Sequence, residues 1–364
     1  MRRLPTTFRR LGRGVTLVEL MVALVLGLVV TLVVSQVMSF AEGQKRTTTG
    51  GSQAQVNGAL ALYTLQRELQ MAGYGLTVNQ AALGCPVAAR HAVGGDFGWT
   101  LTPVTIVDGA DGAPDSLVVL SASRAYSVPL TVTVDHPQDG DRFTVRSAIG
   151  VSTGDLMIAV PLPFAAGNGC SVFNVTAIEP GNQLVHAPGA AGPWNQDGAS
   201  SIFPVAGYPA GTFLFNAGQL VNRTFEIDAQ TLRQRTLDTA TGTVVSQDLF
   251  PQIVNLQALY GKDTDDDGVV DTYDNVTPGD NAGWRQVLAI RLALVARSDT
   301  YQKEEVTQAE PVWDVGTTTA VTGAVDCGTS KCITLKIDGL ADWKHYRYTV
   351  YDVVAPLRNM LWGG

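Results

Sequence analysis

The hydrophobic and polar positions divide the chain into three regions. Residues 1–14 are polar and rich in arginine, and residues 15–40 are apolar apart from Glu19 and a few small polar side chains. After residue 76, short alternating runs recur between turn residues. Twenty-six residues at about 1.5 Å each give a helix of about 39 Å, long enough to span a bilayer with some tilt. The pattern predicts a leader (1–14), an N-terminal transmembrane helix (15–76) and a β-rich head (77–364).

A single acid, Glu19, interrupts the apolar run near its start. An unpaired charge in hydrocarbon costs about 3 kcal/mol even on lenient insertion scales. A carboxylate becomes tolerable there when a cation neutralises it. The position of Glu19 therefore predicts a cationic partner.

The helical pattern continues beyond residue 41 with two apolar sides. One side carries Val56, Leu60 and Tyr63, and the other carries Leu62, Leu65, Leu69 and Ala72. We expect this helix to contact both its own head and adjacent subunits. The weak helix former "TTTGG" at residues 47–51 is expected to break or melt the helix, and "AGYG" at residues 72–75 to end it. If helical throughout, residues 15–72 would measure about 87 Å.

Runs such as "LVVLSAS", "PLTVTVD" and "VLAIRLALVARS" lie between Gly, Pro, Asp and Asn residues. This spacing favours a mainly antiparallel β domain after the helix. The fold class predicted is α+β. The loop-rich piece from about 77 to 112 is expected to be held through Cys85.

The stretch "GVTLVEL", which begins at Gly14, resembles the prepilin leader read by a prepilin peptidase in type IV pilus and type II secretion systems. The resemblance implies cleavage between Gly14 and Val15, N-methylation of Val15, and Glu19 as the fifth mature residue. Val15 departs from the family, which usually has Phe there. The implied partner of Glu19 is the N-terminal amine of a neighbouring subunit, which gives Glu19 a role in assembly.

Three further segments resemble the PilW family of minor pilins: "LQRELQMAGYG" (65–75), "APDSLVVLSAS" (113–123) and "HYRYTVYDVVAPLRNMLW" (345–362). The resemblance implies a pilin-like fold, with a helical spine and a large head at or near the pilus tip. It also implies partners among minor pilins and the major pilin, and a part in initiating pilus assembly for adhesion, twitching motility or DNA uptake. The alternatives are a minor pseudopilin of a type II secretion system, a plain signal anchor, and a signal-anchored periplasmic enzyme or binding protein.

Charge distribution bears on location and partners. Five arginines precede Val15, and their removal changes the net charge from −8 to −13. This acidity disfavours nucleic acid as a direct partner. Arginine before the apolar run predicts a cytoplasmic leader and a C-terminal part delivered across the membrane. With the resemblance, this implies a periplasmic head on the bacterial inner membrane, before transfer to the pilus at the cell surface.

The four cysteines predict disulfides formed outside the cytoplasm. Three connectivities are open. Cys327 with Cys332 is favoured because they close the short loop "CGTSKC", which leaves Cys85 with Cys170.

The segment "DTDDDGVVDTYD" matches a calcium loop. Gly268 takes the sharp-turn position, and the alternative is a solvated acidic turn. The predicted ligands are Asp263, Asp265, Asp267, the carbonyl of Val269, Asp271 and Asp274. The terminal Asp274 stands where Glu is usual.

The sequence predicts no enzyme. "GVSTG" at residues 150–154 fits G-x-S-x-G around Ser152, but a strand-like run follows it where a helix is needed. The four histidines lack metal or triad spacing and are expected to be surface or structural residues.

Overall fold

The computed structural model describes residues 14–77, 79–123, 129–165, 167–195 and 202–361, without the side chains of 43–44 and 46–52. Most of the predicted leader therefore lies outside the described residues. The chain divides into two compact units, Met1–Ser52 and Gln53–Gly364. They are described separately below.

The long helix α1 comprises Leu17–Met71 and contributes to both units. Leu, Val and Ala dominate its first half, and the backbone is α-helical through residues 47–51 as well. The predicted break at "TTTGG" is therefore wrong, because weak intrinsic propensity is overridden within a long continuous helix. After Met71 the chain turns at Gly73 and Gly75, which have φ values of +75° and +71°. That left-handed backbone is readily available to glycine, so the helix ends where "AGYG" predicts.

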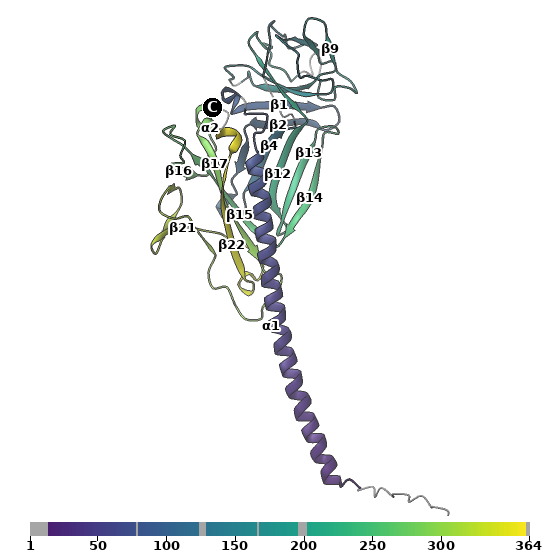
Figure 1. Cartoon of the computed structure of the whole chain (residues 1–364), viewed down its shortest axis with the longest axis vertical. Helices are drawn as coiled ribbons and strands as arrows, with labels where there is room; N and C mark the ends of the chain where they lie inside the picture. Colours follow the sequence, from purple (N-terminus) through teal and green to yellow (C-terminus); the bar gives the residue numbers. More distant parts are fainter. Residues whose placement is uncertain (1–13, 78, 124–128, 166, 196–201, 362–364) are drawn as a thin grey trace, which may run out of the picture. The chain divides into compact units, whose positions relative to one another are not determined.

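The prediction of a mainly antiparallel β head after an N-terminal helix is confirmed (Figure 1). Pairs β1–β8 and β16–β19 are parallel. The strands are β1 (Cys85–His91), β2 (Gly95–Leu101), β3 (Val104–Val107), β4 (Ser116–Ala122), β5 (Leu130–Thr131), β6 (Arg142–Thr144), β7 (Leu156–Val160), β8 (Cys170–Asn174), β9 (Ala177–Glu179), β10 (Gln183–Val185), β11 (Phe213–Gly218), β12 (Leu220–Asp228), β13 (Thr231–Asp238), β14 (Thr243–Pro251), β15 (Ile253–Lys262), β16 (Thr272–Asp274), β17 (Val287–Arg297), β18 (Val312–Asp314), β19 (Ala320–Val321), β20 (Val325–Cys327), β21 (Ser330–Thr334) and β22 (Tyr348–Pro356). Short helices are η1 (Gln80–Ala82), η2 (Ala110–Gly112), α2 (Asn281–Arg285), η4 (Trp343–His345) and α3 (Arg358–Leu361).

Two five-stranded sheets pack against one side of the part of α1 that belongs to the head. Their strand orders are β14-β13-β12-β4-β3 and β19-β16-β15-β17-β22. Leu65 and Leu69 of α1 are fully buried in one core cluster with Phe225 of β12 and Leu256 of β15. Arg223 of β12 also forms an ion pair with Glu68 of α1, at 2.6 Å. The second half of α1 is therefore part of the head core.

The rest of the head is built on a six-stranded sheet, β2-β1-β8-β7-β11-β5, and a three-stranded sheet, β6-β10-β9. Cys85 at the start of β1 is bonded to Cys170 at the start of β8. The second disulfide, Cys327–Cys332, lies in the β20–β21 hairpin of another three-stranded sheet, β18-β21-β20. The sequence favours this pair because it closes a short loop, and Cys85–Cys170 is the pair that then remains.

Candidate assembly site and acidic loop

The first turn of α1 holds Glu19 in a reciprocal cap with Thr16. The Thr16 backbone N–H and hydroxyl both donate to Glu19 Oε2 at 3.2 Å, and the Glu19 N–H donates to Thr16 Oγ1 at 3.2 Å. This is a capping box, which satisfies backbone donors that a helix start otherwise leaves unpaired. The acid also lies at the positive end of the helix dipole. Sequence analysis missed Thr16, although the spacing T-x-x-E in "TLVE" carries the signal.

Gly14 and Val15 precede the capped turn and have no regular secondary structure. Val15 is 71% exposed, and a side-chain carbon at Gly14 would meet nothing within 4 Å. The bond between them therefore lies in open chain immediately before a capped helix. That geometry leaves room for a peptidase to bind the bond.

The first half of α1 presents apolar side chains on every side. Within the described part of the chain, Leu17–Glu42 is a helical stretch long and apolar enough to cross a membrane, with a mean hydropathy of 2.8 and none of it buried. Fourteen Val and Leu side chains from Leu17 to Val37 are exposed, an apolar surface of the kind that lipid or other helices cover.

Further along, α1 is two-sided as the sequence predicts. Leu65, Leu69 and Ala72 are fully buried in the head. On the opposite side, Val56 and Tyr63 are 54% and 63% exposed, and Leu60 is 48% exposed. The exposed residues recur at helical spacing, so they form an outward apolar stripe, named here the Val56–Tyr63 stripe.

The predicted calcium loop is the connection 263–271 between β15 and β16. The structure brings carboxylate oxygens of Asp263, Asp265 and Asp267 within 4.8 Å of one another. Gly268 has a φ of +84°, as the sharp-turn position requires. The negative charges of Asp267 and then Asp271 raise the pKa of Asp265, so a cation here would relieve repulsion.

Two of the remaining predicted ligands, Asp271 and Asp274, have partners outside the three-carboxylate group. The Asp271 carboxylate accepts hydrogen bonds from the N–H and hydroxyl of Thr264, both at 2.7 Å. Asp274 forms an ion pair with Lys262 at 2.6 Å; strand pairing sets Asp274 opposite Tyr260, so Lys262 reaches it diagonally from two residues along β15. Val269 is 62% exposed, and its N–H donates to Asp267 Oδ1 at 2.8 Å. The structure therefore groups three of the five carboxylates and does not bring Asp274 to them.

Comparison with family models gives two matches, one at the N-terminus and one in the head. Residues 9–35 match the prokaryotic N-terminal methylation motif. Residues 219–359 match type IV pilus-assembly protein W. The chain thus matches a PilW-family, prepilin-type pilin. No curated protein sequence matches it.

The PilW match begins at β12 and ends within α3. It contains the acidic loop, the Cys327–Cys332 hairpin, and strands β12 and β15, which contribute Phe225 and Leu256 to the core around α1. Strands β1–β11 lie outside that match. The PilW family is a structural, assembly-component family. Ser152 lies just before strand β7, where the G-x-S-x-G motif requires a helix.

Two histidines of the head form a pair that the sequence does not reveal. His136 and His186 are buried, and their Nε2 atoms lie 2.8 Å apart. They pack among aromatic rings, with Phe143 stacked on His136 at 3.9 Å between ring centroids. Burial lowers the pKa of His136 to about 4 and that of His186 to about 3, the latter also through the charge of His136. Both rings are neutral in the folded head at neutral pH.

We expect the stability of the head to fall as the pH is lowered from about 6.5 towards 4. As the pH falls, the unfolded chain takes up protons on both histidines before the folded chain does. Each histidine therefore lowers the free energy of unfolding by about 1.4 kcal/mol per pH unit. Burial raises the pKa of Asp115 to about 6, so the folded chain takes up this proton first. Asp115 therefore stabilises the head as the pH falls, opposite to the histidines. Melting temperature should therefore be measured against pH for the full chain, for His136→Phe/His186→Phe and for Asp115→Asn. The histidine variant should lose less melting temperature on acidification than the unmodified chain, and the Asp115 variant should lose more. If the histidine variant loses as much as the unmodified chain, the buried histidines are not the cause of the loss.

Proposed function

We propose that the chain is a minor pilin of a type IV pilus, processed between Gly14 and Val15 by a prepilin peptidase and methylated on Val15. The observation that carries this proposal is the capped helix start with Glu19 in its first turn, at the head of an uncovered apolar helix. The methylation-motif match over residues 9–35 supports it. Residues 1–14 are then the leader, 15–76 the assembly helix and 77–364 the head.

In this proposal the helix first lies in the bacterial inner membrane with the head in the periplasm. It then moves into the filament, where other minor pilins, the major pilin and their helices replace lipid around its apolar surface. Glu19 pairs with the N-terminal amine of a neighbouring subunit, which fixes the register between helices while apolar contacts supply most of the cohesion. Nucleic acid is not proposed as a direct partner.

The size of the head supports a position at or near the pilus tip. A bulky head is easier to accommodate at a tip than in a packed shaft, and a tip complex of minor pilins would prime assembly for adhesion, twitching motility or DNA uptake. Gold labelling of the head on native pili tests this position. Label at pilus ends is expected, and label confined to shafts contradicts it.

The rival within the filament class is a minor pseudopilin of a type II secretion system, which would use the same leader and helix. The genes beside this one separate the two: minor pilin genes favour the pilus, and secretion genes favour the pseudopilin. A signal-anchored enzyme would need an activity that depends on Ser152.

The Val56–Tyr63 stripe is proposed to contact an adjacent subunit. Replacing Tyr63 with Asp places a charge on that apolar surface while leaving the buried side of α1 untouched. We expect Tyr63→Asp to lower the amount of this protein in sheared pili about fivefold or more, with unchanged cellular level. Val93→Asp, at an 82% exposed position away from the helix, is the matched control. Equal incorporation of both variants would argue against the stripe as an interface.

The loop 263–271 is proposed to bind calcium through Asp263, Asp265 and Asp267, without Asp274. The grouping of three carboxylates supports this. Millimolar calcium is expected to raise the melting temperature of the full chain, and Asp265→Ala/Asp267→Ala should abolish the rise. Glu304→Ala, at an exposed acid outside the loop, should keep it. If the unmodified chain shows no rise, the loop is a solvated acidic turn.

A further inference from the structure

A cavity of about 960 Å³ opens where three distant segments of the head meet. Its walls come from residues 81–86 around the start of β1, residues 162–165 between β7 and β8, and residues 279–281 before α2. The first two segments lie outside the PilW match and the third lies inside it. The cavity is therefore a joint product of both parts of the head.

Covalent and polar links hold these walls in place. The Cys85–Cys170 disulfide connects the first wall to the strand that follows the second. Asn281 Nδ2 donates to the carbonyls of Gln80 and Leu83, at 2.7 and 2.9 Å. Gly84 lies so close to the ring of Trp284 that a side-chain carbon there would be 2.6 Å from it. The cavity is thus preformed, which lowers the cost of binding a ligand.

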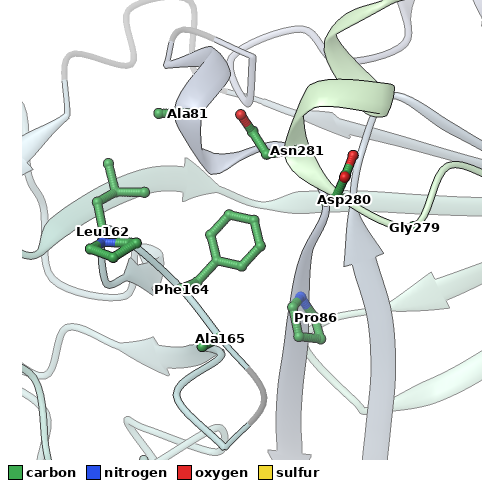
Figure 2. A pocket seen from close by; sticks show the side chains of 10 residues that line it. Ala81, Pro86, Leu162, Phe164, Ala165, Gly279, Asp280 and Asn281 are labelled. Atoms are coloured by element: carbon green, nitrogen blue, oxygen red, sulfur yellow. The ribbon is translucent and has the colours of Figure 1, made fainter.

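The walls are mainly apolar. Leu162, Pro163 and Phe164 form one side and Pro86 another, and Figure 2 shows the Phe164 ring lying centrally among the labelled side chains. Such a surface fits an aromatic or aliphatic ligand body, because apolar lining with a few placed polar groups is the usual composition of a ligand site.

Among the side chains that line the cavity, the polar atoms left for a ligand are acceptors. Asp280 Oδ1 accepts the N–H of Gly283 at 2.8 Å, which orients the carboxylate, and Oδ2 accepts nothing from the described residues. Within the same described part of the chain Asp280 forms no ion pair. The donor group of Asn281 is already used, which leaves its Oδ1 as a second acceptor. A carboxylate and an amide oxygen select a donor-rich cation and repel an anion.

We propose that this cavity binds an organic cation with an apolar body, whose ammonium group contacts Asp280 while its body packs on Phe164 and Leu162. Two sources share this chemistry, a free amine and a lysine side chain of a peptide. The site does not depend on the proposed function, since it needs neither leader processing nor filament entry.

The test uses phenethylamine, 2-phenylethanol and 3-phenylpropionate, which share a ring and differ in charge. Binding is measured by ligand-observed NMR with the full chain in zwitterionic lipid nanodiscs, after subtraction of empty nanodiscs. We expect the amine to bind tightest and the carboxylate weakest. A lysine-containing and a matched glutamine-containing pentapeptide distinguish the sources: selective binding of the lysine peptide extends the site to peptides, and its absence confines it to free amines.

Asp280→Asn is the decisive variant, because asparagine also caps helices well and the local fold is retained while the charge is lost. It should weaken amine binding about fivefold and leave alcohol binding unchanged. Phe164→Ala should weaken the binding of both the amine and the alcohol. Glu304→Gln should change the binding of neither. The proposal is overturned if no probe binds, if the alcohol or carboxylate binds as tightly as the amine, or if Asp280→Asn binds the amine like the unmodified chain.

Discussion

Replacing Glu19 with Gln is expected to lower the amount of this protein in sheared pili about tenfold or more, while its amount in the cell envelope is retained. Glutamine has nearly the same shape and still accepts the Thr16 hydrogen bonds at 3.2 Å, so the helix start survives. It has no charge to neutralise an N-terminal amine. An amine left unpaired among packed apolar helices costs several kcal/mol, which is the source of the expected loss.

Thr16→Ala is the control for this experiment. It removes the cap, which lowers local helix stability by about 1 kcal/mol, and it keeps the carboxylate of Glu19. Incorporation should be much less affected than in Glu19→Gln. If Glu19→Gln enters pili normally, Glu19 serves only as a cap and the assembly role is wrong. Quantitative mass spectrometry of pilus and envelope fractions measures both variants.

Removing the Cys85–Cys170 disulfide is expected to destabilise the head by about 4 to 5 kcal/mol. The bond closes a loop with a sequence separation of 85, and chain entropy released in the unfolded state grows with loop length. This is a large fraction of the stability of an ordinary domain. It also frees the first wall of the cavity beside Gly84 and Pro86. Urea unfolding of Cys85→Ser/Cys170→Ser, followed in the full chain in nanodiscs, measures the change.

The Cys327–Cys332 bond provides the matched control. Its sequence separation is only 5, so Cys327→Ser/Cys332→Ser should cost about 2 kcal/mol in the same assay. Equal losses from the two double variants would contradict the loop-length explanation and would point to local packing around the sulfur atoms.

Local pattern predicts much of this molecule. The apolar run, Glu19, the end of α1 at "AGYG" and the β-rich head can be read from residue order, because each depends on neighbours a few positions away. The side of α1 that carries Leu65 and Leu69 follows from helical spacing alone. The short loop between Cys327 and Cys332 favours that pair, but loop length does not by itself exclude the other connectivities.

Other features depend on register between distant segments. His136 and His186 meet across 50 residues, and spacing gave no sign of the pair. Local spacing matches Asp274 to a calcium loop, but β15 pairs with β16 so that Lys262 reaches Asp274 diagonally and forms an ion pair with it. Residues 47–51 show a different failure of local pattern. Their weak helix propensity predicts a break, but they are helical as part of the long helix α1.

The central claim is that this chain is processed before Val15 and enters a pilus. Mass spectrometry of the N-terminal peptide in sheared, purified pili from the native host, with a deletion strain as control, tests it most directly. A peptide that begins at N-methylated Val15 in the pilus fraction is the predicted result. Its absence from otherwise intact pili, with the protein found only in the cell envelope, would contradict the claim and favour a pseudopilin or a plain anchored protein.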